Sequence, residues 1–243
     1  MGLGHQRPNL GCLMETKIET FPEDIILDWQ DYRAYYSHSR GHSVSGIIRI
    51  APNVFSPQLA NKRDLLVYLP PSYHHTERRY PVIYMQDGQN LFDGATSYAG
   101  EWGVDETMEY LALQEGLEAI VVGIPNAGIH RIDEYSPFRD GRLGGGRGDE
   151  YLRFIVDTIK PQIDMEFRTL PGRKHTGILG SSMGGLISLY AFFEHPTVFG
   201  FAGVMSPSLW FAGGAIFNYV DSAPFHTGKI YLDAGTREYG ESQ

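Results

Sequence analysis

Residues 174–195, KHTGILGSSMGGLISLYAFFEH, decide the fold. A short apolar run over residues 176–179 predicts a strand, and a helix-patterned run over residues 186–193 follows almost at once. Between them lies Gly180-Ser181-Ser182-Met183-Gly184, a G-x-S-x-G pattern. A strand, a tight turn and a helix around this pattern predict a nucleophile elbow, with the hydroxyl of Ser182 clear of the sheet. Gly180 and Gly184 flank the serine because a side chain there would collide with the backbone. The pattern alone also fits a structural Gly-rich turn.

The length, charge and residue composition of the chain exclude several classes of protein. The chain has 243 residues, of which 42% are hydrophobic and 20% charged, enough for a sizeable core. A net charge of −9 argues against a nucleic-acid partner. One cysteine, Cys12, excludes an internal disulfide framework and a cysteine-built metal site. No apolar run approaches the ~18 residues of a membrane span. The N-terminal stretch lacks the apolar core of a signal peptide. The sequence therefore predicts a cytoplasmic protein without a membrane partner.

Strand and helix patterns alternate along the chain. Strands are predicted at residues 45–50, 63–69, 80–85, 117–124, 176–179, 199–205 and 229–232, and helices at residues 104–113, 149–167 and 186–193. Asp149 is the expected cap of the second helix, and Pro161 is expected to kink it or end it near Lys160. Residues 139–148 are expected to form a flexible loop. The alternation predicts an α/β fold, a mostly parallel central sheet covered on both faces after an antiparallel start. We expect one domain over residues 21–243 after a poorly ordered leader over residues 1–20.

Ligands collect at the carboxyl ends of the strands in such sheets, which is where Ser182 lies. An acyl-transferring serine needs oxyanion donors, a base and an orienting acid. In α/β-hydrolases one donor is the N–H after the nucleophile, here that of Met183. The other comes from the loop after the third strand, here residues 87–90. The N–H of Gln89 is the favoured second donor, and that of Gly88 is the alternative.

The acid and the base are harder to assign. The last predicted strand runs into Asp233-Ala-Gly-Thr-Arg-Glu238. Glu238 is favoured as the acid, because Asp233 could instead serve the loop backbone; a third alternative is that neither acts. No histidine follows Glu238 in the 243 residues. His175 and His226 precede predicted strands, at the end away from the pocket. The other histidines do not fit as a base either, although His130 could contact a substrate.

Four stretches resemble the "putative esterase" family of α/β-hydrolases. This family includes esterase D-like enzymes, enterochelin and ferric-siderophore esterases, and the feruloyl and acetyl-xylan esterases of carbohydrate esterase family 1. The stretches are RRYPVIYMQDGQNLFD (78–93), AIVVGIPNAGIHRIDEYSPF (119–138), GILGSSMGGLISLYAFFEHP (177–196) and KIYLDAGTREYGE (229–241). The resemblance implies that Ser182 is the nucleophile and Glu238 the acid. It places the family's catalytic histidine some tens of residues further on. We therefore expect the C-terminal strand and helix of the fold to be missing, which would leave an exposed sheet edge that favours a homo-oligomer.

These observations predict a serine carboxylesterase that hydrolyses small or moderate esters by acyl-enzyme chemistry at Ser182, impaired where no imidazole reaches the hydroxyl. No metal and no organic cofactor is implied. Trp102, Trp210 and Arg131 come after strand ends and are the candidate substrate-binding residues. The alternative is a non-catalytic binding or interaction module on an α/β-hydrolase scaffold. A peptidase or thioesterase would share the same elbow, because fold does not fix function.

Overall fold

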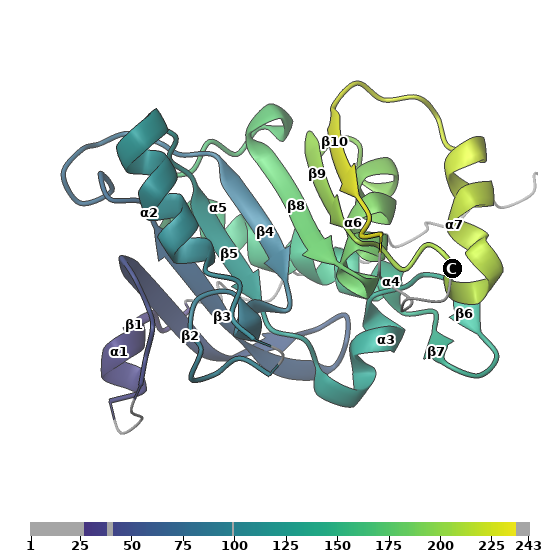
Figure 1. Ribbon diagram of the computed structural model, residues 1–243, viewed down its shortest axis with the longest axis horizontal. Coiled ribbons are helices and arrows are strands. Elements are labelled where there is room, and N and C mark those ends of the chain that lie inside the picture. Colours follow the sequence, from purple (N-terminus) through teal and green to yellow (C-terminus); the bar gives the residue numbers. More distant parts are fainter. Residues whose placement is uncertain (1–26, 38–40, 99, 237–243) are drawn as a thin grey trace, which may run out of the picture.

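The computed structural model describes residues 27–37, 41–98 and 100–236, and an eight-stranded sheet runs through them (Figure 1). Its order is β1-β2-β3-β5-β4-β8-β9-β10. The strands are β1 (Gln30–Asp31), β2 (Ile47–Ser56), β3 (Asn61–Leu69), β4 (Val82–Gln86), β5 (Ile120–Ile124), β8 (Thr176–Ser181), β9 (Phe201–Met205) and β10 (Lys229–Asp233). The pairs from β1 to β5 are antiparallel, and those from β5 to β10 are parallel. The predicted antiparallel start and parallel continuation are confirmed.

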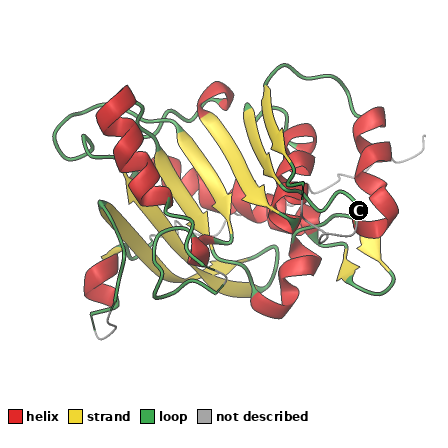
Figure 2. Cartoon of the chain, viewed as in Figure 1, coloured by secondary structure: helices red, strands yellow, loops and turns green. Residues whose placement is uncertain are grey.

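Helices and short turns connect the strands (Figure 2). The helices are α1 (Tyr32–Tyr35), α2 (Val104–Glu115), α3 (Arg131–Glu134), α4 (Gly148–Arg153), α5 (Lys160–Glu166), α6 (Met183–Glu194) and α7 (Phe211–Ser222). A 3₁₀ turn, η1 (Gly88–Asn90), follows β4 directly. Within the loop expected over residues 139–148, β6 (Arg139–Asp140) pairs with β7 (Gly144–Gly145).

Successive side chains of a strand point to opposite faces of the sheet, and the buried residues accordingly form two clusters. On one face Ile50, Tyr68 and Val121 pack with Met108 of α2. On the other face the alternate strand residues pack with α4, α5, α6 and the segment between α4 and α5. Helices thus cover both faces, as predicted.

The second predicted helix departs from expectation at its cap, and it continues past Pro161, where a kink or an early end was expected. Its N-cap is Arg147, and Asp149 lies inside the first turn. The chain then forms a π-helix, η3 (Phe154–Ile159), and continues as α5 through Pro161 to Glu166. A proline lacks the N–H of a regular turn and needs room for its ring, and the wider π turn before it meets both needs. The helix therefore does not end near Lys160.

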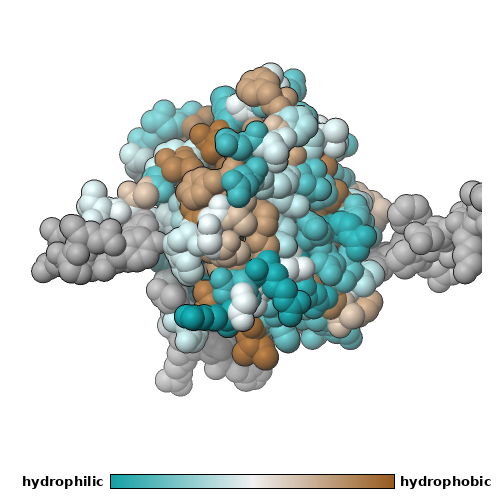
Figure 3. All heavy atoms as spheres, turned by 90° about the vertical axis from the view of Figure 1, so that its right-hand side faces the viewer, coloured by the Kyte–Doolittle hydropathy of each residue, from teal (hydrophilic) through white to brown (hydrophobic). Residues whose placement is uncertain are grey.

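Large apolar side chains are exposed where α7 and β10 lie, the side that Figure 3 faces. Phe217 of α7 and Phe225 are mostly exposed, and Ile230, Tyr231 and Leu232 of β10 are each about half exposed. In the described part of the chain β10 is the outer strand of the sheet. Such an edge is a template for pairing with another strand, so association through it stays a prediction.

No helix among the described residues is both long and apolar enough to cross a lipid bilayer. The location of the protein in the cell stays a prediction of the sequence.

Candidate active site

Strand β8 ends at Ser181, and Ser182 makes the turn into α6. The backbone of Ser182 has φ 56° and ψ −120°, which a non-glycine residue adopts only where its surroundings enforce it. Three hydrogen bonds do so: Ser182 N donates to Met205 O (3.0 Å), and Ser182 O accepts from the N–H groups of Leu186 and Ser208 (3.0 Å each). The side chain itself is exposed. The predicted strand–turn–helix arrangement thus presents the Ser182 hydroxyl at the surface.

Gly180 shows why the turn needs glycine. A Cβ at Gly180 would lie 2.7 Å from both C and O of Gly184 and 2.9 Å from Oε1 of Gln86. The end of β8 and the first turn of α6 are therefore in backbone-to-backbone contact at Gly180 and Gly184. Any larger residue at position 180 would push the serine turn out of place.

Two sets of backbone N–H groups lie at helix starts near the ends of β8 and β4. The first hydrogen bond of α6 runs from Leu186 N to Ser182 O, so the N–H of Met183 precedes the helical ladder. In η1 the first bond runs from Asn90 N to Asp87 O, so the N–H groups of Gly88 and Gln89 likewise precede it. The set at α6 carries the positive end of that helix's dipole, the environment that suits an oxyanion, and the set at η1 adds backbone donors.

Hydrogen bonds from Asn126 and Arg131, which follow β5, hold the loop that carries Gln89 in place. Asp87 has a left-handed backbone (φ 55°), and its carboxylate accepts two bonds from Arg131, from Nε and Nη2, at 2.8 Å each. Asn126 donates to Asp87 Oδ1 through Nδ2 (2.6 Å) and to Gln89 Oε1 through its backbone N–H (3.1 Å). Gly88 fits closely against the next strand, because a Cβ there would lie 2.6 Å from the carbonyl carbon of Gly123. The position of the Gln89 N–H is therefore tightly fixed.

Arg131, a predicted substrate contact, is engaged inside the protein. Burial works against its charge, but the hydrogen bonds and charge of Asp87 outweigh burial and raise its pKa. Its guanidinium also lies 5.0 Å from the ring centre of Tyr135. Arg131 therefore contributes a neutralised ion pair to the pocket wall.

A pocket of about 830 Å³ adjoins the serine turn. Gln89, Trp102, Arg131 and Ser181 line it, together with residues that include Tyr98 and Ile129. Its volume lies within the range of small-molecule sites. Two of the three predicted substrate residues, Trp102 and Arg131, thus meet at one cavity. The third, Trp210, lies just before α7 and is half exposed; it is not among the pocket-lining residues.

The end of β9 supplies a site residue that sequence reasoning missed. The hydroxyl of Ser208 lies 3.0 Å from that of Ser182 and is buried. The only sequence signal was its position in the loop after a predicted parallel strand, on the same edge as Ser182. In the same region Asp233 Oδ1 accepts a bond from Ser206 N (2.9 Å), the backbone role that the sequence left open for Asp233. Glu238, the favoured acid, lies outside the described residues.

None of the described histidines hydrogen-bonds to Ser182. His175 lies just before β8, about 20 Å along the strand from the serine turn. His195 follows the last turn of α6, where burial lowers its pKa. His130 lies 3.7 Å from Asp133, and His42 bonds to Asp93. Within the described residues, the hydrogen-bond partner of the Ser182 hydroxyl is Ser208.

The sequence of this chain matches a known protein family and several known proteins. The family described as "Putative esterase" matches residues 56–242. The protein YbbA of Bacillus subtilis is 31% identical over 77% of this chain and 74% of its own length. An endo-1,4-beta-xylanase/feruloyl esterase of Xylanibacter ruminicola is 24% identical over 95% of this chain, which spans 29% of that protein.

A solved structure agrees on the fold. The siderophore hydrolase EstA of Aspergillus nidulans superposes with a TM-score of 0.63 at 20% identity, over 81% of this chain and 72% of that one. Because the family match covers more than half of the sequence and includes both the serine turn and the loop after β4, the chain belongs to the putative esterase family and is a carboxylic-ester hydrolase with an α/β-hydrolase fold.

Proposed function

We propose that the protein cleaves carboxylic esters through an acyl-enzyme formed on Ser182. The observation that carries the proposal is the exposed hydroxyl of Ser182 on a strained strand–helix turn, beside a pocket and beside backbone N–H groups at two helix starts. This arrangement supplies a nucleophile and the electrostatic stabilisation that acyl transfer requires.

In the proposed reaction Ser182 Oγ attacks the ester carbonyl and loses its proton to a base. The N–H groups of Met183 and Gln89 stabilise the negative charge that develops on the carbonyl oxygen. The C–O bond to the alcohol then breaks, and the alcohol leaves with the proton from the base. Water hydrolyses the acyl-enzyme by the same route in reverse order. The resemblance to the family assigns the base to an imidazole oriented by Glu238.

The pocket indicates the kind of ester. Trp102, Tyr98 and Ile129 give it apolar walls, and Asp87 neutralises the one arginine that lines it. We propose that it receives an apolar or aromatic part of a small to moderate, uncharged ester. The feruloyl esterase activity named for the Xylanibacter ruminicola relative is consistent with an aromatic acyl group.

The test compares Ser182→Ala with the wild-type chain on p-nitrophenyl acetate and on methyl ferulate, with and without added imidazole. We expect serine-dependent hydrolysis, stimulated by imidazole where that base is limiting, and a loss of several powers of ten in Ser182→Ala. A fluorophosphonate probe should label Ser182. Ser222→Ala is the matched control, since Ser222 is exposed in the last turn of α7 and is not a pocket-lining residue, and it should keep most of the activity.

Equal hydrolysis by Ser182→Ala and wild type would contradict the proposal. Failure of the probe to label Ser182 in either condition would favour the alternative, a non-catalytic binding module on this scaffold.

A further inference from the structure

Three carboxylates converge beside the pocket, at the start of α2. Glu101 lies in the loop before the helix, and Asp105 and Glu106 lie in its first turn. One oxygen from each of the three lies within 4.8 Å of the others. The cluster is separate from the serine turn and does not depend on the function proposed for it.

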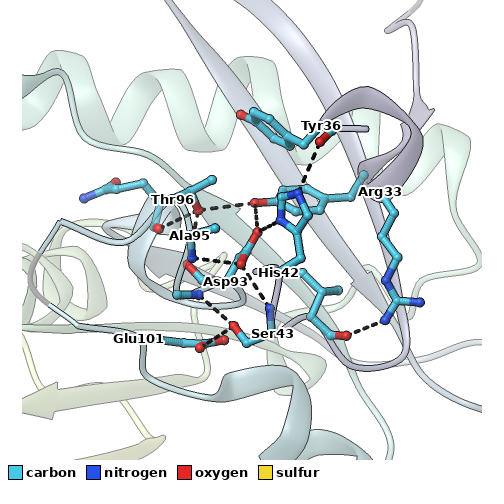
Figure 4. A network of polar contacts seen from close by, with 12 residues as sticks. Arg33, Tyr36, His42, Ser43, Asp93, Ala95, Thr96 and Glu101 are labelled. Carbon is cyan, nitrogen blue, oxygen red and sulfur yellow. Dashed lines mark hydrogen bonds and ion pairs between the residues drawn. The ribbon is translucent and has the colours of Figure 1, made fainter. Parts of the chain in front are cut away.

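Each of the three carboxylates uses one oxygen to accept a hydrogen bond from residues 43–45. Ser43 Oγ donates to Glu101 Oε2 (2.6 Å), a contact drawn in Figure 4. Ser45 donates to Asp105 Oδ2 through its N–H (2.6 Å) and to Glu106 Oε1 through its hydroxyl (3.1 Å). A segment distant in sequence therefore fixes all three groups in place and leaves their second oxygens for another partner.

Two of those second oxygens are buried without a partner. Asp105 is fully buried, and its Oδ1 accepts no hydrogen bond from the described residues; the same is true of the buried Oε1 of Glu101. A buried carboxylate oxygen without a partner is costly, and native proteins rarely leave one. The positive end of the α2 dipole favours acidic residues in the first turn, but it does not pair these oxygens.

The cationic side chains near the three carboxylates bind other groups. His42 pairs with Asp93, and Arg33 donates to the carbonyl of Val44 (Figure 4). Among the ion pairs of the described residues, none includes Glu101, Asp105 or Glu106. The three carboxylates thus lack a protein cation to balance them.

We propose that Glu101, Asp105 and Glu106 bind a calcium ion. All the available ligands are oxygens, which favours a hard cation over zinc or copper. The three oxygens lie within 4.8 Å of one another, close enough to share one ion, and the flexible coordination of Ca²⁺ suits ligands from one short segment better than the strict octahedron of Mg²⁺ does. Glu106 is exposed, and water can complete the coordination on its side.

The ion would connect residues 43–45 to the loop before α2, which carries the pocket residue Trp102. These carboxylate contacts and the hydrogen bonds of Asp93 and Ser43 join residues 43–45 to the segment around the start of α2. Trp102, which follows Glu101, lines the pocket. Calcium would therefore hold the Trp102 wall of the pocket in place without touching the reacting atoms.

The competing occupant is a proton. Burial raises the pKa of Asp105 to about 7, so without a cation this carboxyl can be neutral near physiological pH. A neutral Asp105 beside Glu106 would account for the cluster without any metal. A measurement of calcium binding distinguishes the proton from the calcium ion.

Isothermal titration of the full chain, stripped with EDTA and titrated with CaCl₂ or MgCl₂, tests the proposal. We expect saturable binding of one Ca²⁺ per chain, weaker binding of Mg²⁺, and a Tm that rises with CaCl₂. Glu106→Gln changes an exposed side chain, so it should fold normally and bind Ca²⁺ at least about tenfold more weakly. Asp105→Asn should lose the binding as well.

Glu115→Gln is the matched control, because Glu115 is exposed at the other end of α2. It should bind Ca²⁺ like the wild type. Absence of Ca²⁺ binding by the wild type, or equal binding by Glu106→Gln and Glu115→Gln, would overturn the calcium site and leave the proton as the occupant. Neither result bears on the chemistry at Ser182.

Discussion

The contact between Gly180 and Gly184 makes a quantitative prediction for Gly180→Ala. The added Cβ would lie 2.7 Å from C and O of Gly184, where carbon contacts normally begin near 3.5 Å. Both atoms are backbone, so they cannot rotate away. The strand end and the helix start must therefore separate by about 0.8 Å, and the turn that carries Ser182 must move with them.

That displacement affects two quantities. Overpacking of this kind lowers the free energy of unfolding by about 1–3 kcal/mol. A misplacement of about 1 Å at a reacting group can reduce the rate about 100-fold. We therefore expect Gly180→Ala to fold, to unfold at lower urea, and to react with a fluorophosphonate at position 182 about two orders of magnitude more slowly than the wild type.

The matched control is Gly177→Ala on the same strand. There the Cβ would lie 2.9 Å from Cδ1 of Phe201, a ring atom of a side chain that can rotate, at the strand end away from the elbow. Gly177→Ala should lose stability in urea and keep its labelling rate. If Gly180→Ala, shown to be folded by circular dichroism, labels as fast as Gly177→Ala, then the close contact does not position the nucleophile and the reasoning fails.

Three further predictions concern other parts of the structure. Glu134→Gln should lower the free energy of unfolding by about 3–5 kcal/mol in a urea titration, because it leaves the buried Arg63 without the carboxylate 2.9 Å away; a loss below about 1 kcal/mol would contradict this. The hydrogen bond to Asp93 raises the pKa of His42, so the stability that this pair adds is full below about pH 6.5 and is lost as pH rises through the folded-state pKa. The difference in free energy of unfolding between wild type and His42→Gln, measured in EDTA, should therefore shrink from pH 6 to pH 9. A constant difference would refute this prediction. Ser208→Ala removes the hydrogen-bond partner of the nucleophile, worth about 1 kcal/mol, and should slow fluorophosphonate labelling about fivefold; an unchanged rate would remove its positioning role.

The parts of the fold that rest on strong local patterns were predictable from the sequence. Apolar runs gave β4, β5, β8, β9 and β10 within a few residues of their ends, and α2 and α6 follow their predicted helices. The G-x-S-x-G turn was also predictable, because a strand and a helix flank it and the glycines are required by contact.

Other parts lack a local signal. Helix α7 is interrupted by a kink at Ala212-Gly213-Gly214, where φ is positive, a sequence that favours a loop, and the buried Phe211 and Ile216 lie on either side of it. The π-helix before Pro161 depends on how the chain relieves a local clash. Neither follows from periodicity.

The site residues likewise divide into those that the sequence predicts and those that depend on the three-dimensional packing. Gln89, Trp102 and Arg131 were named from strand ends, and the fold brings them to one pocket. The contact of Ser208 with Ser182 depends on how β9 lies beside β8, which no spacing reveals. The carboxylates before and within α2 resemble an ordinary acidic first turn, and it is their hydrogen bonds to residues 43–45 that set them apart.

The pairing of Asp87 with Arg131 bears on how the enzyme meets its substrate. Two opposite charges 2.8 Å apart form a dipole whose field fades within a few ångströms, whereas a lone arginine would attract anions over about a Debye length. The mouth of the cavity therefore offers no long-range pull on acidic molecules, and the chain as a whole, with a net charge of −9, repels them. The uncharged esters proposed as substrates would enter by diffusion, so their apparent affinity should be indifferent to ionic strength.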